Sequence, residues 1–226
     1  MESGSLLDPN LWVLYQEVHG HDIEYKAKNF WQNILIRQFP WNLNYTVNSE
    51  VSPDGDDRTR VDLSIGQIRE EHHQTLLFLE AKRTGQGNAL IHEAEEQLER
   101  GAKKFLEKSG SRLLYGMTTW GTKARCWIFE RRSGGSFKKT PFYGKYQENL
   151  KDTYIDAHSE RAYYISLFFS IVRDEAPPPM PSSLQLPSQA GGSQGGYDYS
   201  GYQAGSLQGG YSGAWGEVQF STYDQY

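Results

Sequence analysis

A change of composition at Pro177 limits the part of this chain that can fold. From there to Tyr226 the 226-residue sequence contains no lysine or arginine, and glycine, serine, glutamine and tyrosine predominate. Too few aliphatic residues remain in this segment to offset the entropy of ordering it. We therefore expect residues 177–226 to be a disordered tail whose tyrosines are either weak interaction sites for protein partners or part of an inert solvating segment.

Charge and cysteine content narrow the class of protein. The chain has 23 basic and 28 acidic residues and a formal net charge of -5, which argues against coating nucleic acid by bulk charge. The single cysteine, Cys126, excludes an internal disulfide and a cysteine-based zinc site, and we expect a buried thiol. No secretory signal or membrane-length apolar segment is recognisable, so we expect an intracellular protein, cytoplasmic or nuclear and not secreted, without a membrane partner.

Hydrophobic periodicity divides the first 176 residues into helices and strands. Spacings of three and four residues predict helices at 11–18, 23–38, 88–108 and 160–173. Alternating apolar residues predict strands at 43–51, 60–65, 75–82, 113–119 and 123–131. Residues 133–156 give no clear pattern. After an N-terminal extension over 1–22, this order indicates an α/β domain over 23–176, with a mixed sheet flanked by helices.

The strands at 60–65 and 75–82 bring three charged residues to one face. A hairpin centred on Glu71 pairs residues whose numbers sum to 142, so Asp62 faces Glu80. Directly opposed residues of an antiparallel pair have Cα atoms about 4.5–5.5 Å apart. Lys82, two residues beyond Glu80, shares this face. The other face is apolar and comprises Val61, Leu63, Ile65, Leu77, Leu79 and Ala81.

Two acids and a lysine bordered by apolar residues are costly unless a further charge compensates them. A divalent cation between Asp62 and Glu80 would do so, and hard oxygen ligands favour Mg²⁺ or Mn²⁺. Lys82 would then hold or activate an attacking water, or neutralise a phosphate. The simpler alternatives are a solvated strand face and a structural ion pair in a generic α+β domain.

The order of these residues resembles a known nuclease core. Asp62, seventeen further residues, Glu80-Ala81-Lys82, a helix and two strands resemble the αβββαβ core of the PD-(D/E)XK nucleases, the restriction-endonuclease-like fold. The resemblance covers about residues 23–131, although the usual proline before the aspartate is absent. It implies that Asp62, Glu80 and the Ala81 carbonyl bind the metal and that Lys82 orients the nucleophile.

The same resemblance implies a function and accessory residues. The expected reaction is metal-dependent hydrolysis of phosphodiester bonds in DNA, or alternatively RNA, through a Mg²⁺-activated water. The alternative is a catalytically inactive domain that binds nucleic acid or protein. Glu24 matches a metal-binding glutamate on the first helix, with Glu17 and Glu50 as competitors, and Gln97 matches a catalytic glutamine on the later helix. Candidates for contacts with the nucleic-acid backbone are Arg83, Lys103, Lys104 and Arg125.

Other polar and aromatic residues have simpler interpretations. His72 and His73 are expected in a solvated turn and not in a metal site. Trp120 and Trp127 are expected in the core and not as platforms for base stacking. The acids of the 88–108 helix are expected on its solvated face, paired with bases one turn further on. These acids are Glu93, Glu95, Glu96 and Glu99, and the bases are Arg100, Lys103 and Lys104.

Overall fold

The computed structural model describes residues 6–53, 55, 60–70, 72–85, 88–144 and 151–174. All of them lie in the first of two units into which the chain divides, 1–184 and 185–226. The predicted disordered tail, 177–226, and the centre of the predicted hairpin turn, Glu71, lie outside the described residues.

Two helices open the domain, α1 (Pro9–Gly20) and α2 (Glu24–Gln38). The Asp8 side chain caps α1 by accepting the backbone N–H groups of Asn10 and Leu11, each at 2.9 Å. The buried face of α1 carries Leu11, Tyr15 and Val18, which belong to the same hydrophobic core as the buried residues of α2. Helix α1 therefore packs on the domain and is not a detached extension.

The described residues form one seven-stranded sheet with a single parallel pair. Its order is β1-β2-β3-β4-β5-β6, with β7 also paired to β5; only β3 and β4 are parallel, and α3 (Ala89–Ser109) connects them. The strands are β1 (Tyr45–Val51), β2 (Val61–Arg69), β3 (His72–Lys82), β4 (Leu113–Trp120), β5 (Lys123–Arg131), β6 (Phe137–Pro141) and β7 (Ile155–Asp156). The predicted α/β domain with a mixed sheet flanked by helices is confirmed.

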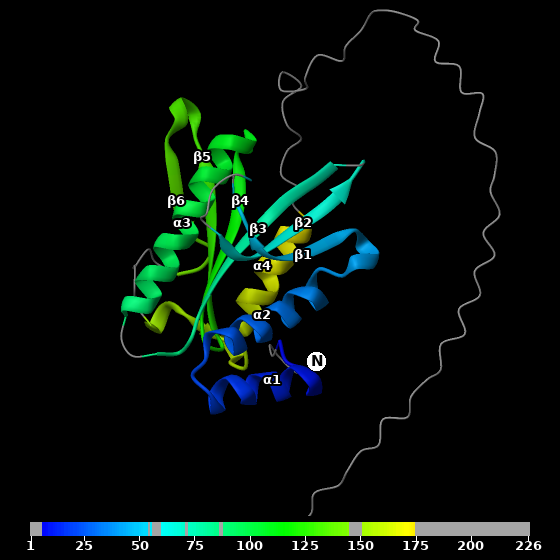
Figure 1. Cartoon of the computed structure of the whole chain (residues 1–226), viewed down its shortest axis with the longest axis vertical. Helices are drawn as coiled ribbons and strands as arrows, with labels where there is room; N and C mark the ends of the chain where they lie inside the picture. Colours follow the sequence, from blue (N-terminus) through cyan, green and yellow to red (C-terminus); the bar gives the residue numbers. More distant parts are fainter. Residues whose placement is uncertain are drawn as a thin grey trace, which may run out of the picture. The chain divides into compact units, whose positions relative to one another are not determined.

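Helices cover both faces of the sheet (Figure 1). Helix α3 packs on one face, where Phe78 and Trp127 join Leu98 in one hydrophobic cluster. Helices α2 and α4 (Tyr163–Asp174) pack on the other face, in a cluster that includes Leu79 and Phe168. Alternate residues of β3 thus enter different clusters, and the face with Phe78 also carries Glu80 and Lys82. Helix α3 therefore covers the strand face on which the predicted site lies.

The β2–β3 register agrees with the prediction near the site and departs from it near the turn. Leu63 pairs with Leu79 and Ile65 with Leu77, as a sum of 142 requires. A bulge between Ile65 and Gly66 then shifts the pairing by one residue. A Cβ atom at Gly66 would lie only 2.1 Å from Nε2 of His73, so a larger residue there would displace this ring.

Three local predictions need correction. Strands β2 and β3 are longer than predicted, so His72 and His73 lie on β3 and not in the turn, and His73 Nε2 lies 2.9 Å from Thr46 Oγ1. Residues 133–156 contain β6 and β7, both too short to produce an alternating pattern. The third correction concerns Glu95, which is buried beneath α3 and not on its solvated face.

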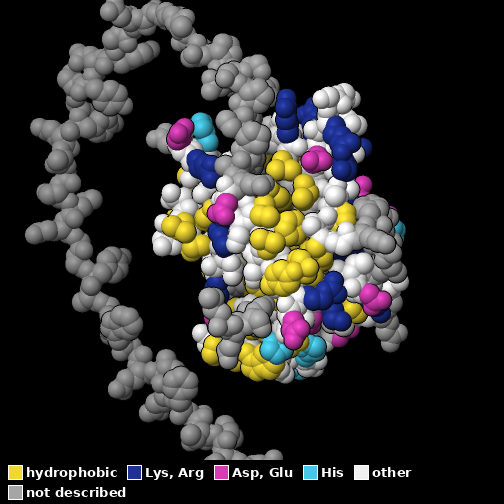
Figure 2. All heavy atoms as spheres, turned by 180° about the vertical axis from the view of Figure 1, so that it is seen from behind, with side chains coloured by type: hydrophobic (Ala, Val, Ile, Leu, Met, Phe, Trp, Pro, Cys, Tyr) yellow, Lys and Arg dark blue, Asp and Glu magenta, His cyan; other side chains and the backbone are white. Residues whose placement is uncertain are grey.

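Several elements of the domain expose hydrophobic side chains. Figure 2 shows hydrophobic side chains gathered in the middle of one face of the molecule. On α4, Tyr163 and Leu167 are each 47% exposed, and Leu167 also lines a cavity of about 410 Å³ with Phe142, Tyr143, Gly144, Arg161 and Tyr164. Within the described residues, no helix is both long and apolar enough to cross a membrane.

Candidate functional site

The predicted acids, Asp62 and Glu80, lie near the ends of two paired strands, β2 and β3. Asp62 is the second residue of β2, and Glu80 lies near the end of β3, each adjacent to the paired residues Leu63 and Leu79. The backbone N–H of Ala81 donates to Asp62 Oδ2 at 2.8 Å. This bond fixes the Asp62 carboxylate against β3, so the sheet register brings the two predicted acids together.

Glu80 is a buried acid, and no described residue provides it with a cationic partner at hydrogen-bond distance. Its side chain is only 3% exposed, and within the described part of the chain its Oε1 atom has no hydrogen-bond partner. Burial, followed by the charge of Asp62 and a hydrogen bond with Asp62, raises the pKa of Glu80 to about 9, against the opposing charge of Lys82. The surroundings of Glu80 therefore disfavour its charged form in the absence of a further cation.

The ammonium group of Lys82 is held by helix α3. Lys82 is 8% exposed, and its Nζ lies 3.1 Å from Glu93 Oε1. Burial alone would lower the pKa of Lys82, but the hydrogen bond to Glu93 and the charges of Glu24, Glu93 and Glu80 together raise it. The end of β3 is also fixed, since the backbone N–H of Gly121 donates to the Lys82 carbonyl at 2.8 Å. The Lys82 ammonium is therefore charged and held in one position by Glu93.

The accessory residues predicted from sequence lie around this core. Glu24 begins α2, and its charge acts on both Glu80 and Lys82, which places it beside the site. Gln97 is linked to Lys82 through Glu93: its Nε2 donates to Glu93 Oε1 at 3.2 Å, and the same oxygen lies 3.1 Å from Lys82 Nζ. Gln97 therefore positions Glu93, which in turn holds Lys82.

Sequence reasoning missed the roles of two residues at the site, Lys28 and Glu93. Lys28 on α2 places its Nζ 3.5 Å from Asp62 Oδ1 and 3.3 Å from Glu50 Oε1. Glu93 was expected only as part of a solvated helix face. Their spacing could have indicated these positions. Lys28 follows Glu24 by one helical turn and Glu93 precedes Gln97 by one turn, so each pair lies on the same side of its helix.

The four predicted nucleic-acid contacts divide into accessible and buried residues. Arg83 is exposed beside the site, with NH1 3.9 Å from Asp22 Oδ2, and Lys103 is exposed on α3. Lys104 is partly exposed on the same helix. Arg125 has no exposed surface, so its prediction is corrected: buried beneath α3, it cannot reach a nucleic-acid backbone.

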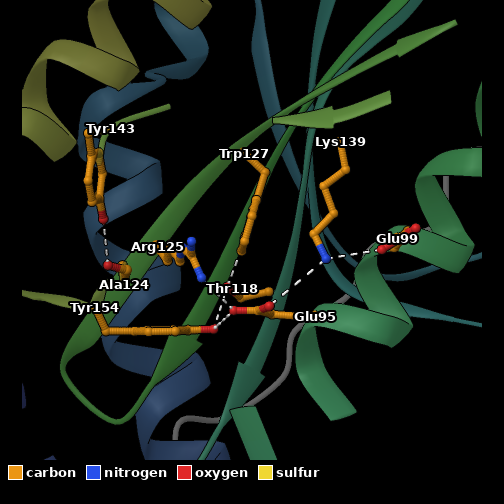
Figure 3. A network of polar contacts seen from close by, with 9 residues as sticks. All are labelled: Glu95, Glu99, Thr118, Ala124, Arg125, Trp127, Lys139, Tyr143 and Tyr154. Carbon is orange, nitrogen blue, oxygen red and sulfur yellow. Dashed lines mark hydrogen bonds and ion pairs between the residues drawn. The ribbon is translucent and has the colours of Figure 1, made fainter. Parts of the chain in front are cut away.

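Arg125 instead belongs to a buried network between α3 and β5 (Figure 3). Its NH1 donates to Glu95 Oε1 at 3.2 Å, and the Tyr154 hydroxyl donates to the same oxygen at 3.1 Å. The other carboxylate oxygen, Oε2, lies 3.9 Å from Lys139 Nζ. The guanidinium of Arg125 and the Lys139 ammonium lie 4.2 and 4.6 Å from the centre of the Trp127 ring.

These contacts compensate the charge of Glu95 from within the protein. Burial raises the pKa of Glu95, while Arg125, Lys139 and the hydrogen bond from Tyr154 act in the opposite direction. Thr118 extends the network, because its hydroxyl accepts from Trp127 Nε1 at 3.0 Å and lies 2.8 Å from the Tyr154 hydroxyl. The network therefore anchors α3, the helix that carries Glu93 and Gln97.

The residues around Glu80 fit a divalent cation held by a small set of oxygens. Within the described part of the chain, no group of three or more His, Cys, Asp or Glu side chains has the arrangement of a metal site. Asp62 and Glu80 contribute two carboxylates, and the predicted third ligand is the backbone carbonyl of Ala81. The Glu80 oxygen without a partner has the donor chemistry that Mg²⁺ and Mn²⁺ prefer.

Comparison with family models, with curated proteins and with solved structures finds no match to this chain. The function is therefore argued from the residues of the site.

Proposed function

We propose that this protein is a metal-dependent nuclease that resembles the PD-(D/E)XK enzymes and hydrolyses phosphodiester bonds of DNA, with RNA as the alternative substrate. The observation that carries the proposal is the arrangement around Glu80. A buried carboxyl group without a cationic partner lies against a second carboxylate, beside a positioned lysine. At neutral pH the raised pKa keeps Glu80 protonated, and a divalent cation could take the place of that proton.

The order of elements supports the proposal. Helix α2 precedes the antiparallel strands β1, β2 and β3, and α3 then leads to β4, which is parallel to β3. This is the αβββαβ order expected for a restriction-endonuclease-like core. The two acids and the lysine lie on β2 and β3, the middle strands of that order, which supports the proposal.

The mechanism assigns a role to each residue. Asp62, Glu80 and the Ala81 carbonyl would hold Mg²⁺ or Mn²⁺, with Glu24 as an accessory acid. When bound, the cation would supply Lewis acidity and lower the pKa of a coordinated water. Lys82 remains protonated, because its pKa is raised. It therefore orients the nucleophile and neutralises the phosphate, and it does not act as the general base.

Glu93 and Gln97 keep the Lys82 ammonium in place. Glu93 Oε1 lies 3.1 Å from Lys82 Nζ and accepts from Gln97 at 3.2 Å, so the lysine cannot rotate freely into solvent. Positioning of this kind reduces the entropy lost on reaching the transition state. Arg83 and Lys103 are exposed bases that can contact the phosphate backbone on either side of the scissile bond.

Cleavage of plasmid and single-stranded DNA with Mg²⁺ or Mn²⁺ tests this function. Lys82→Ala and Asp62→Asn should each lower the cleavage rate by about 10²–10⁴-fold, the usual contribution of one such catalytic group. Arg100→Ala, an exposed base on α3, is the matched control and should cleave at close to the wild-type rate. A wild type that does not cleave and binds no divalent cation would instead indicate a nuclease-like domain used as a binding module.

A further inference from the structure

Lys28 occupies a position between two carboxylates that a metal ion would also favour. Its Nζ lies 3.5 Å from Asp62 Oδ1 and 3.3 Å from Glu50 Oε1. The other oxygen of Asp62, Oδ2, already accepts the backbone N–H of Ala81. The Asp62 oxygen nearest to the lysine is therefore the one left for a cation, and the ammonium and a divalent cation would compete for it.

Helix α2 and strand β1 are both arranged to support this contact. Lys28 follows Glu24 by one helical turn, so α2 directs an acid toward Glu80 and a base toward Asp62. Its side chain is only 19% exposed, which keeps the ammonium close to the carboxylates. Glu50 has a left-handed backbone, with a φ of 53°, a conformation that glutamate rarely adopts.

Glu50 gives Lys28 a second partner outside the core of the site. The Glu50 side chain is 72% exposed, whereas that of Asp62 is 23% exposed. An ammonium that leaves Asp62 can thus keep its contact with the more solvated Glu50, without the cost of an unpaired charge. The arrangement allows a small displacement along the line between the two acids.

We propose that Lys28 is an internal counter-ion that neutralises Asp62 in the cation-free protein and is displaced toward Glu50 when a divalent cation binds. This inference rests on the proposed function, because it concerns the same cation site. It assigns to Lys28 control of the cation affinity and not a role in the hydrolysis itself.

Calorimetric titration of Mn²⁺ into the full chain tests the inference without any measurement of cleavage. Lys28→Met keeps the length of the side chain and removes its charge, so it should lower the dissociation constant by about three- to tenfold, the range expected for loss of one partly exposed competing charge. Lys28→Arg retains the charge and should bind Mn²⁺ with close to the wild-type affinity.

Lys26→Met is the matched control. Lys26 lies on the same helix and its side chain is 17% exposed, but its Nζ lies 4.0 Å from Glu17 of α1. If the gain in affinity came from a general loss of positive charge, this variant would bind Mn²⁺ as tightly as Lys28→Met. We expect it to match the wild type, and far-ultraviolet circular dichroism should show that every variant is folded.

Each result decides between the two proposals. Equal or weaker binding by Lys28→Met, with a wild type that binds Mn²⁺, overturns the counter-ion role and leaves the nuclease proposal in place. Binding by Lys28→Met alone supports the counter-ion role, while it contradicts a metal-dependent activity of the wild type. No binding by either protein overturns both.

Discussion

Two buried glutamates on adjacent elements have opposite surroundings. Glu80 on β3 and Glu95 on α3 are 3% and 2% exposed, and burial raises the pKa of both. Glu95 is surrounded by cations and donors that the protein itself provides, whereas the nearest charged neighbours of Glu80 include a second acid, Asp62. Lys82, whose charge acts on Glu80, has its ammonium held by another acid, Glu93.

This difference separates a structural ion cluster from a candidate active site. Glu95 Oε2, like Glu80 Oε1, lacks a hydrogen-bond partner among the described residues, but two cations lie within 3.9 Å of the Glu95 carboxylate, and this cluster contributes to the position of α3. A buried acid without such partners destabilises the cation-free fold and gains from any cation that binds. Stability is therefore expected to fall when Glu95 loses a partner and to rise when Glu80 loses its charge.

The largest effect is expected when the Glu95 cluster is broken. Arg125→Met leaves the Glu95 charge buried without its closest cation, so the free energy of unfolding should fall by about 3–5 kcal/mol. Urea denaturation measures this change. Arg100→Met removes an exposed arginine of α3 and should change stability by about 0.5 kcal/mol or less. Similar small changes for both variants would show that the cluster is not essential to the fold.

A smaller effect of opposite sign is expected at Glu80. The folded pKa of about 9 lies above the ordinary value of 4.5, so the stability that protonated Glu80 provides is present below about pH 4.5 and is lost as the pH rises toward 9. Glu80→Gln keeps the shape without this penalty, and in EDTA at pH 8 it should raise the unfolding free energy by about 2 kcal/mol.

A pH series distinguishes this effect from a general gain in packing. The difference between Glu80→Gln and the wild type should be near zero at pH 4.5 and should grow toward pH 9. Glu96→Gln, an exposed acid on α3, should show no such growth. A difference that stays constant with pH would contradict the titration of Glu80 over this range.

The smallest effect is expected at Gln97. Gln97→Ala removes the hydrogen bond to Glu93, so Lys82 is held less firmly, and the cleavage rate should fall by about three- to tenfold. The dissociation constant for Mn²⁺ should not change, because Gln97 acts through Glu93 and not on the metal. A weaker affinity with an unchanged maximal rate would assign Gln97 to the metal site instead.

The sequence predicted the geometry correctly where the regular alternation of side chains along a strand determines it. The two-residue period of a strand was enough to place Glu80 and Lys82 on one face, and a single hairpin assumption gave the pairing of Leu63 with Leu79. The shift after Ile65 was not predicted, because the assumption of one regular hairpin register does not include a bulge.

Charged residues with distant partners were the main source of error. The helical pattern placed Glu95 on the solvated face of α3, whereas its partner Arg125 lies thirty residues later, on β5. Lys28 was missed for a similar reason: its spacing from Glu24 places it on the same side of α2, but its contact with Asp62 joins two elements that are distant in sequence. Which acid meets which base is decided by tertiary packing, and a single sequence contains no direct record of it.

The response of thermal stability to Mn²⁺ tests the cation site at Glu80 most directly. Saturating Mn²⁺ should raise the melting temperature of the wild type by about 5 °C or more, since a ligand at a hundred times its dissociation constant adds about 2.7 kcal/mol. Glu95→Gln should melt at a lower temperature but keep this increase, while Glu80→Gln should lose it. An increase that persists in Glu80→Gln, or is absent from the wild type, would contradict a metal site at Glu80.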